Sequence, residues 1–266
     1  MTSTMVSHDS DCGAVPDQTT VGRPRARVRA WTLAIASGLV VSAGALLLIP
    51  IGLLTLFQLR RLYSACARAI SQTVLRLYGI RLVVHRRDLL PRHQTVFVSN
   101  HTSTLDVFLL VALGLPNCRF FMSGFLRKFV PLGVISWMMG TFFTVPQTRP
   151  LERKRIFARA ERVLRRTRES VYLSPEGGRI RTGGVGPFNK GAFHLATNLR
   201  VPIVPLYIRI PSSVDPGFGY DARPGTVDIF VLPALDTTGW TLGNLIANKE
   251  RVRDVLIGAH RELRAS

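Results

Sequence analysis

The chain has 266 residues, enough for one large domain or two small ones. It carries 35 Lys and Arg against 16 Asp and Glu, a net charge of +19, and 47% of its residues are hydrophobic. The apolar content excludes a disordered basic tail, and the presence of one long uncharged run, not many, excludes a polytopic transporter. The positive charge indicates an anionic partner: a nucleic acid, an anionic membrane or a phosphorylated substrate.

The N-terminal 60 residues divide by charge into three parts. Residues 1–22 hold three Asp and no Lys or Arg, and their polar composition predicts a disordered leader. Four arginines follow between residues 23 and 29, and then residues 31–59 carry no charge at all. An uncharged run of this length exceeds the roughly 18 residues that indicate a membrane segment. The three cysteines at positions 12, 66 and 118 lie far apart, which argues against a zinc site or a disulfide framework.

Two membrane arrangements are consistent with the uncharged run. Pro50 is expected to interrupt a helix there, so the run forms either a single tilted span over 31–51 or a bent pair of helices that enters one leaflet and returns. Arginines flank both ends, which favours both ends on the cytoplasmic side. A basic amphipathic pattern continues to residue 78 and favours the bent form. A buried core helix is the alternative, and a cleaved signal peptide fits less well because the leader is long and a basic segment follows.

From residue 80 onward, short β-branched runs alternate with longer periodic segments. Strands are predicted at 80–84, 95–99, 119–122, 141–145, 171–174, 203–210 and 227–232. Helices are predicted at 105–113, 151–169, 188–198 and 249–264. This alternation predicts an α/β fold with a mostly parallel sheet flanked by helices, preceded by a membrane-associated helical segment. The expected divisions are a leader at 1–22, membrane-anchoring helices at 23–78 and an α/β domain at 79–266.

The first candidate constellation is Asn100-His101-Thr102-Ser103-Thr104-Leu105-Asp106, where a strand ends and a helix begins. Such turns often carry catalytic groups in α/β folds. The loop can bring the imidazole of His101 back onto the carboxylate of Asp106. A neutral imidazole accepts a proton near pH 7, and an adjacent carboxylate fixes its tautomer. The pair is therefore a candidate general base, although a surface His and a helix-capping Asp would give the same pattern.

The second constellation is Ser174-Pro175-Glu176-Gly177-Gly178-Arg179, at the end of another predicted strand. The glycines allow close approach of a ligand to the backbone, and Arg179 offers a planar fork for a phosphate. Glu176 is expected to hold either Arg179 or a substrate hydroxyl. A glycine-rich turn with a surface ion pair is the simpler alternative. Neither the phosphate-loop pattern nor G-x-S-x-G occurs, which argues against a nucleoside triphosphatase and against an α/β-hydrolase.

Together these motifs resemble those of the glycerolipid acyltransferases of the 1-acylglycerol-3-phosphate acyltransferase type. The likeness covers residues 75–260 and includes two further segments, Gly186-Pro187-Phe188-Asn189-Lys190-Gly191 and Val201-Pro202-Ile203-Val204-Pro205. The resemblance implies that His101 deprotonates the free hydroxyl of a lysolipid and that Asp106 orients it. It also implies that Glu176, Gly177, Gly178, Arg179, Lys190 and Arg149 bind the acceptor.

The implied reaction transfers an acyl group from acyl-CoA or acyl-carrier protein to a lysolipid, most simply 1-acylglycerol-3-phosphate, without a metal or prosthetic group. The implied location is a membrane, with the active site on the cytoplasmic side. The sequence departs from the family where Gly178 replaces a Thr, Ile180 replaces a Ser and Pro146-Gln147 replaces an Asp-Arg pair. These positions concern the acceptor, so a different lysolipid or a catalytically silent lipid-binding protein are the alternatives.

Two other classes fit less well. A nucleic-acid-binding module would account for the charge of +19, but the basic residues lie beside the apolar run and on the 151–169 helix, without interleaved aromatic residues. A Ser-His-Asp hydrolase using Ser99 or Ser103 would lack a nucleophile elbow. We therefore expect an anionic membrane, a lysolipid and an acyl thioester as partners, and no nucleic acid.

Overall fold

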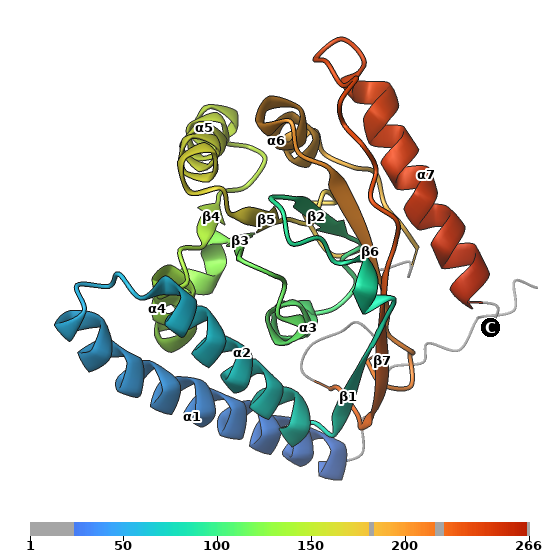
Figure 1. The fold of residues 1–266 in the computed structure, drawn as a ribbon. Coiled ribbons are helices and arrows are strands. Elements are labelled where there is room, and N and C mark those ends of the chain that lie inside the picture. The colour runs from blue at the N-terminus through green and yellow to red at the C-terminus, as the bar shows by residue number, and fades with distance from the viewer. Residues whose placement is uncertain (1–23, 181–183, 216–220, 265–266) are drawn as a thin grey trace, which may run out of the picture.

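A seven-stranded sheet forms the centre of the protein, with helices on both faces (Figure 1). The structure, a computed structural model, describes residues 24–180, 184–215 and 221–264. The predicted leader at 1–22 lies outside the described residues. The strand order is β1-β7-β6-β2-β5-β3-β4. The strands are β1 Ile80–His85, β2 Val96–Ser99, β3 Cys118–Ser123, β4 Phe142–Thr144, β5 Ser170–Tyr172, β6 Ile203–Arg209 and β7 Gly225–Val231.

Every strand pair is parallel except β6 and β7, which run antiparallel. The predicted α/β class with a mostly parallel sheet is therefore confirmed. Each predicted strand is present, with ends that differ by at most two residues from those expected. Parallel strands buried on both faces read as continuous apolar runs, which is why the sequence located them.

Two helical layers cover the sheet (Figure 1). One face carries α1 Pro24–Leu54, α2 Arg60–Leu77, α3 Asp106–Leu113 and α4 Val130–Met138, and the other carries α5 Pro150–Thr167, α6 Gly191–Leu199 and α7 Leu245–Arg264. Two short 3-10 helices, η1 Arg87–Leu89 and η2 Gly124–Lys128, complete the set. The predicted helix at 188–198 begins only at Gly191, and the predicted helix at 249–264 begins four residues earlier, at Leu245.

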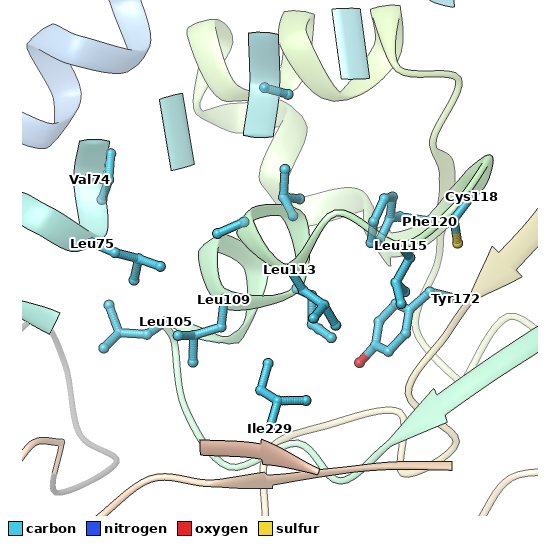
Figure 2. Close-up of a cluster of buried hydrophobic side chains, with 14 of the residues drawn as sticks. Val74, Leu75, Leu105, Leu109, Leu113, Leu115, Cys118, Phe120, Tyr172 and Ile229 are labelled. Carbon is cyan, nitrogen blue, oxygen red and sulfur yellow. The ribbon is translucent and has the colours of Figure 1, made fainter. Parts of the chain in front are cut away.

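Helix α3 lies at the centre of the first core and fixes the loop that precedes it. Figure 2 shows Leu105, Leu109 and Leu113 directed toward side chains of α2, β7 and β5. Leu109 is fully buried and Leu113 nearly so. Burying a leucine side chain contributes about 1.5–3 kcal/mol, so α3 is held firmly and gives a fixed end to the preceding loop, where His101 lies.

Helices α1 and α2 form a hairpin, and the expectation that Pro50 interrupts the first helix is wrong. Helix α1 continues through Pro50 to Leu54, and the chain turns at Leu56 and Phe57, both with positive φ. Pro50 lacks an N–H and its ring crowds the carbonyl four residues earlier, but it lies close to the end of α1 at Leu54, so only the last turns of the helix are affected. A second helix therefore does follow the apolar one, but whether the segment spans the membrane or enters one leaflet and returns stays a prediction.

The outer surface of the hairpin is apolar. Residues Arg27–Leu54 are long and apolar enough to cross a membrane, with a mean hydropathy of 2.2 and only 22% of the window buried. Large side chains are exposed along α1 and its turn, and α4 adds Trp137 at 55% exposure. The alternative of a buried core helix is wrong for α1, because most of its apolar surface packs against nothing in the described chain.

Candidate active site

His101 lies just beyond the carboxyl end of β2, a central strand between β6 and β5. Asn100 fixes this loop: its side-chain amide donates to the carbonyl of Ile208 at 2.9 Å and accepts the N–H of Ile208 at 2.8 Å. Asn100 is buried, and the paired bonds join the loop to the backbone of β6. The crevice beyond the carboxyl ends of parallel strands is the usual place for a ligand in such sheets.

The imidazole of His101 contacts the carboxylate of Asp106, as the sequence predicted. Nδ1 lies 2.5 Å from Oδ2 of Asp106, and the same oxygen accepts the N–H groups of Thr102 at 3.0 Å and Ser103 at 3.1 Å. Asp106 is the first residue of α3, where the helix dipole also stabilises a carboxylate. A carboxylate held by several donors keeps Nδ1 protonated and leaves Nε2 with a lone pair. The His101 side chain is 31% exposed, so the ring is accessible.

A second carboxylate, that of Asp215, supports the same loop and was not predicted from the sequence. The hydroxyl of Ser103 donates to Asp215 and accepts the N–H of Leu105 at 2.9 Å. Asp215 lies in the connection after β6, more than 100 residues away in the chain, and both side chains are buried. No local motif marks Asp215, so only the folded topology could reveal this contact.

The serine-nucleophile alternative does not fit this geometry. Ser99 is fully buried, and its hydroxyl donates to the carbonyl of Asn100 and bonds the hydroxyl of Tyr172. Ser103 is 2% exposed and directed to Asp215. A nucleophile must reach both its base and a substrate, and neither hydroxyl meets this requirement.

The second loop, residues 174–180, follows the adjacent strand β5 and packs against the first. Glu176 accepts the N–H of His101 at 2.6 Å with one carboxylate oxygen and the N–H of Gly186 at 2.8 Å with the other. The N–H of Ile180 donates to the carbonyl of His101 at 2.8 Å. The carboxylate of Glu176 thus accepts hydrogen bonds from backbone groups. The sequence-based expectation that it holds Arg179 is wrong. Burial raises the pKa of Glu176 to about 7, although the hydrogen bonds from Gly186 and His101 lower it.

Arg179 contacts the loop that carries the candidate base. Arg179 is exposed, and its Nη1 donates to the hydroxyl of Thr104 at 2.6 Å. Thr104 lies between His101 and Asp106 in the chain. Gly177 has φ +70, and a Cβ there would lie 2.7 Å from the side-chain nitrogen of Asn189. Nothing lies within 4 Å of a Cβ built at Gly178. The loop therefore presents an open backbone and an exposed guanidinium on the same side as His101.

Two further predicted acceptor residues, Lys190 and Arg149, lie outside the two loops of the site. Lys190 is exposed at the N-cap of α6, next to Asn189, whose side chain donates to the carbonyls of Pro175 and Glu176. Arg149 is exposed and pairs with Glu152 at 3.5 Å. Within the described ranges, no hydrogen bond or ion pair joins Lys190 or Arg149 to the loops of His101 and Glu176. Instead, the side-chain nitrogen of Gln147 lies 3.3 Å from a Cβ built at Gly177, which places Gln147 at this loop.

The chain is similar to known acyltransferases over this region. A family model described as "Acyltransferase" matches residues 81–209. The human 1-acyl-sn-glycerol-3-phosphate acyltransferase alpha is 31% identical over 191 residues, covering 70% of this chain and 66% of the relative. The yeast (Saccharomyces cerevisiae) 1-acyl-sn-glycerol-3-phosphate acyltransferase is 28% identical over 201 residues, 74% of this chain and 65% of the relative. The chain belongs to the 1-acylglycerol-3-phosphate acyltransferase family.

A solved structure of the same type supports the fold. The crystal structure of the 1-acyl-sn-glycerophosphate acyltransferase PlsC from Thermotoga maritima matches with a TM-score of 0.72 and 18% identity, covering 91% of this chain and 98% of that one. The α/β fold is therefore that of an acyltransferase. The curated relatives are longer, and the alignments with the human and yeast relatives span less than two thirds of their lengths.

The residues that depart from the acyltransferase family pattern lie in or against the second loop, residues 174–180. Gly178 and Ile180 flank Arg179, and Gln147 lies against the same loop. Within the first loop, by contrast, the pair of His101 and Asp106 is complete. The altered positions thus lie at the loop of Arg179 and leave the pair of His101 and Asp106 unchanged.

Proposed function

We propose that the protein transfers an acyl group from a thioester, carried by coenzyme A or acyl-carrier protein, to the free hydroxyl of a lysolipid. The observation that carries this proposal is the 2.5 Å contact between Nδ1 of His101 and Asp106, beside the exposed Arg179. The preferred acceptor is 1-acylglycerol-3-phosphate, which the names of the curated relatives give as their substrate. Its phosphate matches the planar donors of Arg179.

The step follows from the tautomer that Asp106 imposes. With Nδ1–H directed to the carboxylate, Nε2 of His101 accepts the proton of the acceptor hydroxyl as its oxygen attacks the thioester carbon. Asp106 stabilises the imidazolium that forms. The C–S bond then breaks, the thiolate takes the proton back from Nε2, and the new ester leaves with no acyl-enzyme intermediate. This chemistry uses no metal or prosthetic group.

Within this proposal some of the six acceptor residues meet the acceptor directly and the others act on it indirectly. Arg179 binds the phosphate, while Gly177 and Gly178 leave room for the head group. Glu176 positions the loops through backbone N–H groups, and Lys190 and Arg149 contribute positive charge from farther away. The apolar hairpin α1–α2 holds the protein on an anionic membrane, with the active site on the cytoplasmic side.

The proposal is tested with the purified full chain, vesicles that contain a lysolipid, and acyl-CoA labelled in the acyl group. We expect labelled phosphatidic acid from 1-acylglycerol-3-phosphate. A panel of lysophosphatidylglycerol, lysophosphatidylcholine and lysophosphatidylethanolamine, with acyl-carrier protein as a second donor, identifies another acceptor if the altered loop prefers one. Absence of transfer with every acceptor and donor would contradict the proposal and support a silent lipid-binding protein.

A further inference from the structure

A buried ion cluster lies at the end of the sheet opposite to His101. Glu169, which precedes β5, is 6% exposed, and its two carboxylate oxygens pair with Arg60 at the start of α2 and with Arg119 in β3. These residues lie at the amino ends of the strands, whereas His101 and Arg179 follow the carboxyl ends. The cluster is thus separate from the candidate active site.

The cluster carries more positive than negative charge. Two arginines share the single carboxylate of Glu169, and the charges of Arg61 and Arg166 act on them from nearby. Burial, followed by the charges of Arg60 and Arg166, lowers the pKa of Arg119 to about 10. A buried cation without a matched anion is costly, so an additional anion at this place would be stabilised.

The arginines also keep unused donors. Arg60 donates to the carbonyl of Met139 at 3.4 Å and to the side chain of Asn117 at 3.3 Å, and Arg119 donates from Nη1 to the carbonyl of Gly140 at 3.2 Å. No hydrogen bond or ion pair to the described residues involves Nε of Arg60 or Nη2 of Arg119. Arginine N–H groups in a fixed fork suit phosphate oxygens.

Arg60 and Arg119 both line an open cavity of about 410 Å³. Its lining includes Arg60 and Arg119 together with Phe57 and Gln58 of the hairpin turn and Trp137 of α4. The rings of Phe57 and Trp137 meet edge to face at 4.9 Å. Beside the cavity, the hairpin turn exposes Leu54 at 87% and Leu56 at 75%. A phosphate in the cavity would therefore lie next to an apolar surface able to receive hydrocarbon chains.

We propose that this cavity binds the phosphate of an anionic phospholipid, with Arg60 and Arg119 as its ligands and the exposed leucines of the α1–α2 turn against the lipid chains. The site is distinct from the acceptor site and does not depend on the proposed reaction. Such a lipid would fix the hairpin to the sheet and set the orientation of the enzyme on its membrane.

The test follows Trp137 fluorescence of the full chain in a neutral detergent. The protein is titrated with dihexanoylphosphatidylglycerol, with dihexanoylphosphatidylcholine and with inorganic phosphate. We expect a saturable change that is tightest for the anionic lipid and that disappears in Trp137→Phe. Equal binding of inorganic phosphate and anionic lipid would show a phosphate site without lipid preference and overturn the lipid assignment.

Charge changes at Gln58 leave the ion cluster intact, because this side chain is exposed on the cavity wall. We expect Gln58→Glu to weaken binding of the anionic lipid roughly fivefold and Gln58→Lys to tighten it by a similar factor. Two controls should bind like the wild type: Ala69→Glu, an equal charge change at an exposed position of α2, and Arg179→Gln, which removes a cation from the His101 site. The proposal is overturned if no titration saturates, if both Gln58 variants bind like the wild type, or if Arg179→Gln abolishes binding.

Discussion

At the scale of single residues, Asp106 decides what His101 can do. One carboxylate oxygen of Asp106 accepts from Nδ1 of His101 and from two backbone N–H groups. The other oxygen is buried and has no hydrogen-bond partner in the described part of the chain. Asp106 thus holds the loop and sets the tautomer of the ring at the same time, which makes it a positioning residue for the base.

We expect Asp106→Asn to reduce kcat for acyl transfer by about 10²–10⁴, because an amide cannot stabilise the imidazolium and permits the wrong tautomer. KM for the acceptor should change much less, since Asp106 is buried and its hydrogen bonds go to residues 101–103 of its own loop. Steady-state kinetics with labelled acyl-CoA measure both constants. Asp88→Asn, at an exposed position in η1, is the matched control and should behave like the wild type. An unchanged kcat in Asp106→Asn would show that His101 needs no carboxylate.

Glu176 joins the two loops of the site and should respond to pH. Its pKa is about 7 in the folded protein because of burial, above the ordinary value of 4.5 that the unfolded chain would show. Between these values the folded protein holds a proton that the unfolded chain has released. The stabilisation from this group is therefore full below pH 4.5 and is lost as the pH rises toward 7.

We expect Glu176→Gln to remove this pH dependence and to lower the free energy of unfolding by about 1–3 kcal/mol. The cause of the loss is that the glutamine amide offers one oxygen to two backbone N–H groups, those of His101 and Gly186. Thermal unfolding of the variant and the wild type between pH 4.5 and 8 measures both effects. Parallel pH profiles of the two proteins would contradict the assignment of this titration to Glu176.

At the scale of elements, the α1–α2 hairpin combines an inner face that packs on the protein with an outer face that no described residue covers. Val41, Ala45 and Leu48 of α1 are buried in the same core as α3, so the hairpin is part of the fold. Leu54 at its end is 87% exposed. This division explains how one apolar segment can join the core and still offer a surface to lipid.

We expect Leu54→Asp to reduce the fraction of protein bound to anionic vesicles and to leave the fold unchanged, because the side chain has few contacts in the protein and a charge there opposes insertion. The matched control is Leu151→Asp on α5, at the opposite face of the sheet and 75% exposed. Vesicle flotation measures the bound fraction, and circular dichroism checks the fold. Equal binding of both variants would show that the end of the hairpin does not enter the membrane.

At the scale of the whole molecule, the sequence predicted the features that depend on local residue patterns, namely the strands and the loop of His101. Buried parallel strands read as apolar runs, and the five-residue spacing between His101 and Asp106 implied a loop that brings them together. The uncharged run also indicated a helix, but the sequence did not show that this helix continues through Pro50 and that the chain turns only at Leu56 and Phe57.

What the sequence could not show depends on contacts between distant segments. The antiparallel pairing of β6 and β7 and the bond from Ser103 to Asp215 arise only when the sheet is assembled. The same holds for the pairing of Glu169 with arginines from α2 and β3. No spacing rule links these residues, since loop lengths and strand order bring them together. The sequence also could not predict that Glu176 accepts two backbone N–H groups, because every residue type except proline carries such a donor.

The positive charge is unevenly distributed over the molecule. Arginines flank the first helix and cover α5, while Arg60 at the start of α2 and Arg119 in β3 belong to a buried cluster at the other end of the sheet from His101. Arg179, in contrast, donates to Thr104 in the loop of the candidate base. Most of the net charge of +19 is thus positioned for a surface and little of it for the acceptor.

The most direct test of the central claim is the single-turnover rate of acyl transfer in His101→Ala, compared with the wild type and with His93→Ala, a histidine exposed in the loop before β2. The mechanism predicts a loss of about a hundredfold or more in His101→Ala, with acceptor binding retained, and no loss in His93→Ala. A His101→Ala rate equal to that of the wild type would contradict the assignment of His101 as the general base.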